Sequence, residues 1–393
     1  MRVAILTREY PPAVYGGAGV HVEYLSRELA HHVEVAVHCF GAARTSPLVV
    51  RAHQPWDELT DLALATISVD LSIAQHVGDT DLVHSHTWYA NLAGHLAKLR
   101  WGVPHVCTTH SLEPLRPWKA EQLGGGYALS TFCERTALES ADAVIAVSEQ
   151  MRRDVLRCYP AVDPSRVTVI HNGIDPDEYR PDRDTDVLEA RGIDPTRPMV
   201  VFVGRMTRQK GITHLLAAAP QIDPAAQLVL VAGAPDTAEF GAEVRALYAA
   251  AQERRGDIIW IEDMLPRREV IQVLSHAAVF VCPSIYEPFG LVNLQAMACE
   301  AAVVASAVGG IPEIVVEGET GHLVPCRLDT QAPDAAAAGL FASALAERIN
   351  SLLADPTRAA AFGRRGRRRV VERFSWAAVA TQTAELYRAL VQS

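Results

Sequence analysis

Two cations follow an apolar run that begins the second half of the chain. Residues 199–203 read Met-Val-Val-Phe-Val, and Arg205 and Lys210 come shortly after, in a turn ended by Gly211. In open parallel sheets, ligands bind outside the carboxyl ends of the strands. A guanidinium binds phosphate oxygens as a fork of donors, and an ammonium binds them as a point charge. The spacing predicts a diphosphate site, with a pair of ordinary surface cations as the alternative. The sequence lacks the Gly-Lys-Ser/Thr of a P-loop.

A single carboxylate occupies a similar position further along. Glu287 lies between the apolar run 278–281 and a segment with helical character that opens at Gly290 and Leu291. Free N–H groups at a helix start favour an anion, and glycine allows close approach of a ligand to the backbone. Beside such an anion site, Glu287 could hold the hydroxyl groups of a sugar.

A glycine-rich turn follows the first apolar run. It reads Tyr15-Gly16-Gly17-Ala18-Gly19-Val20 and opens a helical segment, without the Gly-x-Gly-x-x-Gly spacing of a dinucleotide site. Glycines serve tight turns as well as phosphate contacts, so both interpretations stay open.

Histidines gather at the ends of two predicted strands. His110 follows the run 103–108, which favours a place at the site, although most of the fifteen histidines should be structural. His84, His86 and His110 resemble a metal cluster, but no carboxylate or cysteine spacing supports one, so no metal site is expected.

A further loop, at Asp263 and Met264, follows the apolar run 258–261. It could contact a nucleobase, and an ordinary surface loop is an equal alternative.

The elements that would position these residues form two α/β halves. Continuous apolar strands that alternate with helices predict parallel sheets covered on both faces. We expect a doubly wound Rossmann-like domain at 1–172, a proline- and charge-rich linker at 173–198, and a second such domain at 199–374. A last helix runs from about 375, and a site is expected in a cleft between the halves. The expected strands are 3–7, 33–40, 81–84, 103–108, 143–147, 167–170, 199–203, 228–232, 258–261, 279–282 and 303–306. The expected helices are 20–31, 91–100, 128–140, 212–219, 238–254, 267–276, 291–298, 337–354 and 375–390, with a low-complexity loop at 332–338.

Composition excludes several classes of protein. The 393 residues are 49% apolar and 21% charged, as in an ordinary globular protein, and the net charge of −10 argues against nucleic-acid or anionic-membrane partners. The arginine-rich run 364–369 is interpreted as a solvated helix face. Seven scattered cysteines favour reduced thiols. Arg8 and Glu9 interrupt the first apolar run too early for a signal peptide, and no run is long enough to span a membrane, so we expect a cytoplasmic protein.

Taken in order, several motifs closely resemble the retaining nucleotide-sugar glycosyltransferases of the GT-B fold, family four. Within the family, the chain is most similar to the actinobacterial glycogen synthase and α-maltose-1-phosphate synthase group. The resemblance covers essentially the whole chain, and only the ordered set of motifs is specific. These motifs are Glu9-Tyr10-Pro11-Pro12 with Gly16-Gly17, Thr109-His110-Ser111, residues 171–175, 204–211, 287–291, 309–313 and 318–321.

The resemblance implies roles for the residues named above. Arg205 and Lys210 would neutralise the leaving diphosphate, Glu287 would bind donor hydroxyls, and His110 would lie at the reacting sugar. The remaining donor contacts would come from Gly16, Gly17, Asp263, Met264, Phe289, Gly290, Leu291 and residue 295. Acceptor contacts are expected from Glu9, Trp88, Asn91, Ser111, Arg116 and Lys119, where Arg116 and Lys119 could bind a phosphate or be surface residues.

One position departs from the family pattern. Eight residues after Glu287, the family has a second glutamate for the ribose hydroxyls, and this chain has Gln295. A carboxamide has one acceptor oxygen and donates through its NH₂, so we expect weaker donor binding.

The resemblance implies transfer of glucose from ADP-glucose to glucose 1-phosphate, giving α-maltose 1-phosphate, or to an α-1,4-glucan. Donors with UDP or GDP stay open. The alternatives are a glycogen synthase that acts only on glucan, a transferase with a lipid or other small acceptor, a sugar epimerase, and an inactive nucleotide-sugar binding protein. No metal or other cofactor is required, because arginine and lysine supply the positive charge. The oligomeric state stays open, with a homodimer as one candidate.

Overall fold

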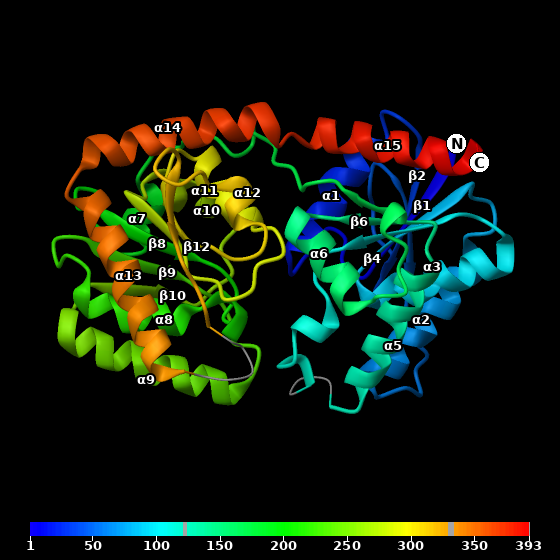
Figure 1. Cartoon of the computed structure of the whole chain (residues 1–393), viewed down its shortest axis with the longest axis horizontal. Helices are drawn as coiled ribbons and strands as arrows, with labels where there is room; N and C mark the ends of the chain where they lie inside the picture. Colours follow the sequence, from blue (N-terminus) through cyan, green and yellow to red (C-terminus); the bar gives the residue numbers. More distant parts are fainter. Residues whose placement is uncertain (121–123, 329–333, 393) are drawn as a thin grey trace. The chain divides into compact units, whose positions relative to one another are not determined.

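The computed structural model describes residues 1–120, 124–328 and 334–392. Contacts divide the chain into two compact units. The first comprises Met1–Gly173 and Trp376–Ser393, and the second comprises Ile174–Ser375. Each unit contains one parallel sheet with helices packed on it (Figure 1).

The first unit is built on a seven-stranded sheet in the order β3-β2-β1-β4-β5-β6-β7. Every ladder between neighbours is parallel. Strand β1 is a continuous apolar run because both faces of the sheet are covered, and its residues Val3 to Leu6 are fully buried. The strands are β1 (Arg2–Thr7), β2 (Glu34–Phe40), β3 (Val49–His53), β4 (Leu82–His86), β5 (His105–Thr109), β6 (Ala143–Ala146) and β7 (Val167–Val169).

Two groups of helices cover this sheet. One group packs together and comprises α2 (Leu62–His76), α3 (Trp88–Trp101) and α5 (Gly126–Ser140); the others are α1 (Gly17–Leu29), α6 (Glu149–Cys158) and α15 (Trp376–Gln392). The last of these, α15, packs on α1 (red and blue in Figure 1), where the rings of Trp376 and Tyr24 stack with centroids 5.7 Å apart. The core between sheet and helices includes Leu6, Ile73 and Val83.

The second unit contains a six-stranded sheet in the order β10-β9-β8-β11-β12-β13, again parallel throughout. In both sheets the chain order reverses beside the first strand, the kind of switch point at which ligands bind in doubly wound folds. The strands are β8 (Met199–Val203), β9 (Gln227–Val231), β10 (Ile258–Ile261), β11 (Val279–Cys282), β12 (Ala302–Ser306) and β13 (Gly321–Val324).

Helices pack on both faces of the second sheet. On one face α8 (Ile212–Ala218), α9 (Ala238–Arg255) and α13 (Ala335–Leu353) pack together, and on the other lie α10 (Arg267–Ser275), α11 (Leu291–Ala298) and α14 (Pro356–Arg373) (Figure 1). Two short helices, α7 (Asp186–Ala190) and α12 (Ile311–Ile314), complete the unit. Its core includes Phe202, Leu215, Leu345 and Phe362.

The predicted elements agree closely with the structure, with several corrections. Elements β3, β13, α2, α6 and α12 were not expected, and of α14 only the arginine-rich run 364–369 was interpreted as helical. The segment 174–198, expected as a linker, belongs to the second unit and contains α7, where the Val187 N–H donates to the Gln272 side chain over 2.8 Å. In the loop expected at 332–338, residues 332–333 lie outside the described residues and 335–338 are the first turn of α13.

The arginine-rich run is not simply a solvated face. Arg367 donates to the carbonyls of Pro176 and Tyr179, and Arg369 donates to those of Glu313 and Ile314. These guanidinium groups therefore hold loops of the second unit in place.

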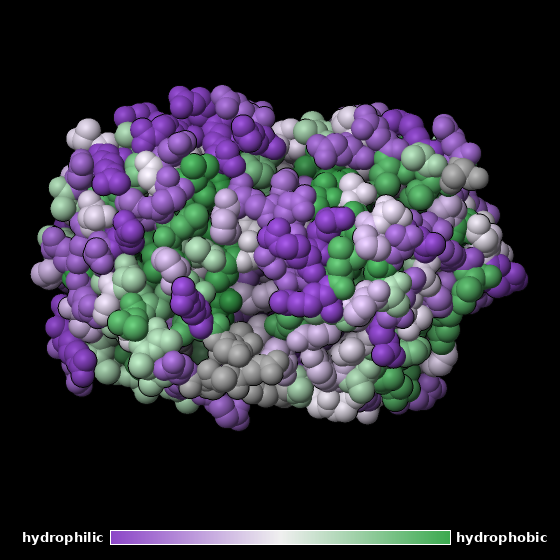
Figure 2. Space-filling model, viewed as in Figure 1, coloured by the Kyte–Doolittle hydropathy of each residue, from purple (hydrophilic) through white to green (hydrophobic). Residues whose placement is uncertain are grey.

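The surface has the distribution expected of a chain with large apolar cores. Figure 2 shows hydrophilic residues over much of the visible face, with separate hydrophobic areas between them. All seven cysteines are free. Within the described part of the chain, no helix has both the length and the apolar composition needed to cross a membrane.

Candidate active site

In the second unit, a lysine and a glutamate meet beyond the ends of two adjacent strands. Lys210 lies in the short turn after β8, and Glu287 lies in the loop after β11. The Lys210 ammonium donates to Glu287 Oε2 over 2.6 Å, and the Ser284 hydroxyl donates to the same oxygen over 3.0 Å. The side chains are only 16% and 7% exposed. Lys210, predicted to bind a diphosphate, and Glu287, predicted to bind a sugar, therefore form one buried ion pair.

Glycines permit the close backbone packing that holds this pair. A Cβ on Gly211 would lie 2.0 Å from the carbonyl oxygen of Pro283, and one on Gly309 would lie 1.8 Å from that of Glu287. Both glycines have positive φ angles, +66° and +55°. The N–H of Gly310 donates to the Glu287 carbonyl over 3.0 Å. Only glycine allows these approaches, so the loops that carry Lys210 and Glu287 are fixed by contact with neighbouring backbone.

Other residues predicted to bind the nucleotide sugar lie close to Lys210 or Glu287 in the sequence. Arg205 is half-buried in the loop directly after β8. Gly290 has φ +109° and precedes the first turn of α11, which begins at Leu291. The Phe289 side chain is 2% exposed and packs against Phe374, so a ligand contact from this residue would come from its backbone.

The carboxamide of Gln295 has a partner. Its Nε2 donates to the Tyr179 hydroxyl over 3.0 Å. That bond uses one of the two N–H groups of the amide, and Oε1 is the atom that could accept a hydrogen bond from a hydroxyl.

The predicted base contacts lie at the surface. Asp263 follows β10, its side chain is 76% exposed, and it forms an ion pair with Arg191 over 3.1 Å. Met264 is also exposed. The exposed apolar side chain of Met264, beside the end of a strand, is suited to pack on the flat ring of a nucleobase.

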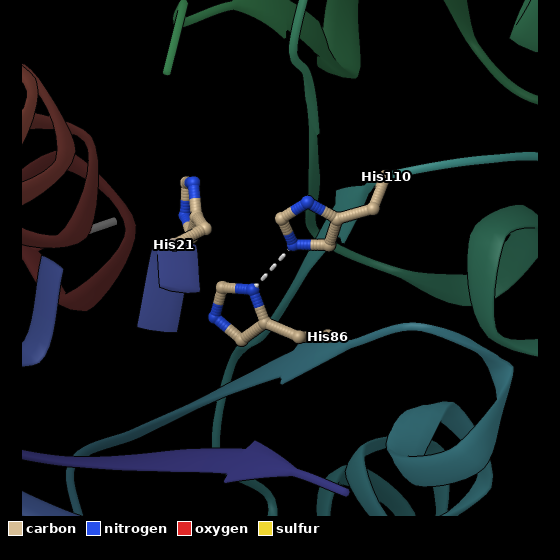
Figure 3. Close-up of side chains that lie close together, drawn as sticks. All are labelled: His21, His86 and His110. Carbon is tan, nitrogen blue, oxygen red and sulfur yellow. Dashed lines mark hydrogen bonds between the residues drawn. The ribbon is translucent and has the colours of Figure 1, made fainter. Parts of the chain in front are cut away.

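Three histidines meet in the first unit (Figure 3). His86 ends β4, His110 follows β5, and His21 lies on α1. His86 Nδ1 and His110 Nε2 are 3.0 Å apart in a hydrogen bond, and the His21 and His110 rings meet edge to face with centroids 4.7 Å apart. Burial lowers the pKa of His21 to about 4 and lowers the pKa values of His86 and His110 well below the usual range. The imidazoles are therefore neutral at pH 7.

The three histidines that meet are not the three that the sequence suggested. His84, expected beside His86 and His110, is fully buried and bonds the Thr108 hydroxyl over 2.7 Å and the Tyr387 hydroxyl over 2.5 Å. His21 takes its place, and its Nδ1 lies 2.8 Å from Asn172 Oδ1. The potential ligand atoms of His21, His86 and His110 lie within 4.8 Å of one another. The sequence did not point to His21 because it lies within α1 and does not directly follow a strand in the chain.

The glycine-rich turn at the start of α1 already binds an anion, the carboxylate of Glu9. Glu9 Oε2 accepts the N–H groups of Tyr15 and Gly16, each over 2.7 Å. The Gly16 N–H is thus engaged within the protein, which differs from its expected role toward a donor phosphate. Gly17 is exposed at the helix start. Glu9, expected at the acceptor, thus fixes this turn through Oε2.

Two other expected acceptor residues are buried within the first unit. Trp88 is 3% exposed and stacks on Tyr89 with ring centroids 4.1 Å apart. Asn91 is also 3% exposed, and its Oδ1 accepts the Ser85 hydroxyl over 3.0 Å. Both side chains therefore support the turn into α3 from inside.

The remaining acceptor candidates follow β5. Arg116 donates to the Ser111 hydroxyl over 3.0 Å and lies 3.6 Å from Glu113 Oε1. The Glu113 N–H donates to Glu134 Oε1 over 2.8 Å, and burial raises the pKa of Glu134 to about 8. Lys119 is half-buried just beyond this network. The structure thus brings Ser111 and Arg116 into direct contact.

Comparisons with known proteins found two matching family models and relatives of similar length. Residues 15–178 match the model described as Glycosyltransferase Family 4, and residues 184–369 match that described as Glycosyl transferases group 1. The chain is 54% identical over 392 residues to an alpha-maltose-1-phosphate synthase of Mycolicibacterium smegmatis and 52% identical over 391 residues to one of Mycobacterium tuberculosis; both comparisons cover 99% of each chain. Among solved structures, sucrose-phosphate synthase from Thermosynechococcus elongatus is similar, with a TM-score of 0.81, 28% identity, and coverage of 99% of this chain and 98% of that one.

Proposed function

Because this chain belongs to the family-4 glycosyltransferases, enzymes that use nucleotide sugars, we propose that it transfers glucose from ADP-glucose to glucose 1-phosphate. The product would be α-maltose 1-phosphate, with the configuration of the transferred sugar retained. The observation that carries this proposal is the 54% identity, over 99% of both chains, to a relative named for that product.

The geometry of the second unit supports the donor half of the proposal. The Lys210 ammonium keeps two N–H groups for phosphate oxygens while the third donates to Glu287. Arg205 lies in the same loop. Glu287, with one oxygen engaged by Lys210 and Ser284, keeps the other for sugar hydroxyls.

The proposed reaction needs no nucleophile from the protein. The bond from C1 of glucose to the ADP oxygen breaks while the acceptor's 4-hydroxyl oxygen bonds to C1 from the same face. The hydroxyl proton passes to the leaving diphosphate. The main task of the protein is then to stabilise the negative charge that develops on that diphosphate, which is the kind of electrostatic work that fixed cations perform well.

In the first unit, His110 would contact the reacting sugar as a neutral imidazole. Its pKa, lowered by burial, keeps it uncharged at pH 7, so it acts through a hydrogen bond rather than a charge. Its bond to His86 fixes the ring orientation.

Incubation with ADP-, UDP- and GDP-glucose, each with glucose 1-phosphate or a malto-oligosaccharide, tests the proposal. Product masses and the anomeric configuration from NMR would be measured. We expect α-maltose 1-phosphate from ADP-glucose as the fastest reaction. Elongation of the oligosaccharide with no transfer to glucose 1-phosphate would support the second candidate, a glycogen synthase that acts on glucan.

A further inference from the structure

An arginine that follows the first strand contacts an aromatic ring. Arg8 comes directly after β1, is half-buried, and its guanidinium carbon lies 4.1 Å from the ring centroid of Tyr89. Within the described residues, no carboxylate lies within ion-pair distance of Arg8. A guanidinium that is partly withdrawn from water without a carboxylate loses hydration that only an anionic ligand restores fully.

A second guanidinium acts on the same tyrosine. Burial raises the pKa of Tyr89; the positive charge of Arg8 opposes that rise and the negative charge of Glu113 adds to it, while Arg116 and Glu9 make smaller contributions in the same two directions. Both cations therefore lie close to one phenol. The Arg116 side chain is 13% exposed, and its Nε is buried with no partner in the described part of the chain. The Ser111 hydroxyl, which accepts from Arg116 Nη1, adds a third polar group.

Two carboxylates of this region, Glu9 and Glu113, each have one oxygen held by other groups of the protein. Glu9 Oε2 accepts the two N–H groups of the turn before α1. Glu113 Oε2 accepts the Ser130 hydroxyl over 2.8 Å, and Oε1 forms an ion pair with Arg116 at 3.6 Å, a distance too long for an ordinary hydrogen bond, so the N–H groups of Arg116 are not used up by it. The raised pKa of Glu134 keeps much of that buried carboxyl protonated at neutral pH. The two guanidinium groups thus retain donors for an anion.

We propose that Arg8 and Arg116, gathered around Tyr89, bind the phosphate group of a phosphorylated sugar acceptor, with Ser111 as a neutral partner. A phosphate monoester carries close to two charges and three acceptor oxygens, which match two guanidinium forks. A neutral glucan offers no such charge. The inference rests on the proposed function for its acceptor and adds Arg8 as a residue that selects a phosphorylated sugar over a glucan.

The experiment compares Arg8→Gln, Arg116→Gln and the control Arg100→Gln. Arg100 is exposed on α3 and also stacks on an aromatic ring, with its guanidinium carbon 4.4 Å from the Trp101 centroid, but it lies at the opposite end of the helix from Tyr89. Rates with glucose 1-phosphate and with a malto-oligosaccharide are measured, together with calorimetric binding of glucose 1-phosphate and of inorganic phosphate. We expect Arg8→Gln to raise the KM for glucose 1-phosphate about 10- to 100-fold, the loss of one charge-assisted hydrogen bond, with the donor KM unchanged. Arg8→Lys should recover part of the loss, because it keeps the charge without the fork.

The results separate this inference from the proposed function. If the unaltered enzyme binds glucose 1-phosphate and Arg8→Gln weakens that binding, but transfer occurs only to glucan, the anion site stands and the proposed acceptor is wrong. A KM for glucose 1-phosphate within about twofold of the parent in a folded Arg8→Gln protein overturns the inference. Equal losses with both acceptors also overturn it, as does the absence of calorimetric binding of both phosphate ligands at millimolar concentration.

Discussion

Removal of the Lys210 charge should lower both the stability of the protein and its kcat, for two different reasons that a second substitution can tell apart. In Lys210→Met the chain keeps a side chain of similar length, while Glu287 loses its partner at 2.6 Å. Leaving one charge of a buried pair alone costs roughly 3–5 kcal/mol. Because the Lys210 side chain keeps 16% exposure, we expect about 3 kcal/mol. For a unit of this size, that lowers the unfolding midpoint by roughly 6–12 °C.

The catalytic loss has a different origin and should persist when stability is restored. Removing one donor from a charge that develops in the transition state typically lowers kcat by about 10²- to 10³-fold. In Lys210→Met with Glu287→Gln, the unpaired carboxylate is gone, so most of the lost stability should return while kcat stays low. Differential scanning calorimetry and initial rates of ADP release at saturating acceptor measure the two quantities.

Arg208→Met provides a matched control from the same turn. Arg208 pairs with Glu243 at 3.0 Å, but the two side chains are 45% and 43% exposed. Exposed pairs contribute about 0–1 kcal/mol, so both stability and kcat should stay near the parent values. If Lys210→Met keeps kcat within about tenfold of the parent, or if the double variant recovers turnover together with stability, the diphosphate role of Lys210 is refuted.

Three other predictions concern the donor site and the cores. Gln295→Glu should lower the apparent KM for ADP-glucose by about 5- to 30-fold, the value of roughly 1–2 kcal/mol for a charged hydrogen bond; an unchanged or higher KM contradicts the ribose assignment. Asp70 is fully buried on α2, and burial raises the pKa of its carboxyl well above the usual range. The folded state therefore holds this proton more tightly than the unfolded state, and the resulting stability is present in full below about pH 4 and lost as pH rises through the folded pKa. Asp70→Asn should accordingly gain stability over the parent between about pH 5 and 8 in thermal melts, and a gain that is independent of pH would show that the carboxyl does not titrate as argued. Gly309→Ala would place a Cβ 1.8 Å from the Glu287 carbonyl oxygen and should lower both stability and kcat. Gly318 also has a positive φ, but a Cβ there would have no atom within 4 Å, so Gly318→Ala should lower stability only slightly. If the two variants lower kcat equally, packing of Gly309 against Glu287 does not explain the effect.

The sequence predicts the sheets well because their strands are buried on both faces. The runs 258–261 and 279–282 were expected with the bounds that β10 and β11 have. Such strands are short, continuous and apolar, so they stand out from their neighbours. Helix α6 was missed for the opposite reason. It is mostly polar, and its only buried apolar residues, Met151 and Val155, give a single i, i+4 pair.

For the candidate site, the sequence indicates which residues follow strands, but it does not indicate the contacts that they form. A position after a strand identified Lys210 and Glu287, but it could not show that they pair with each other. Glu9 was assigned to a ligand, yet it binds the turn before α1, since the distance from a carboxylate to two amides depends on how the chain folds back. Arg8 was noted only as a charge that interrupts an apolar run. Its contact with Tyr89, 81 residues later, arises from the pairing of β1 with β4, which precedes α3.

A crystal of the protein soaked with ADP would show whether cations of the second unit neutralise the leaving diphosphate. We expect diphosphate oxygens within hydrogen-bond distance of both the Arg205 guanidinium and the Lys210 ammonium. ADP bound with its phosphates away from both groups would contradict it.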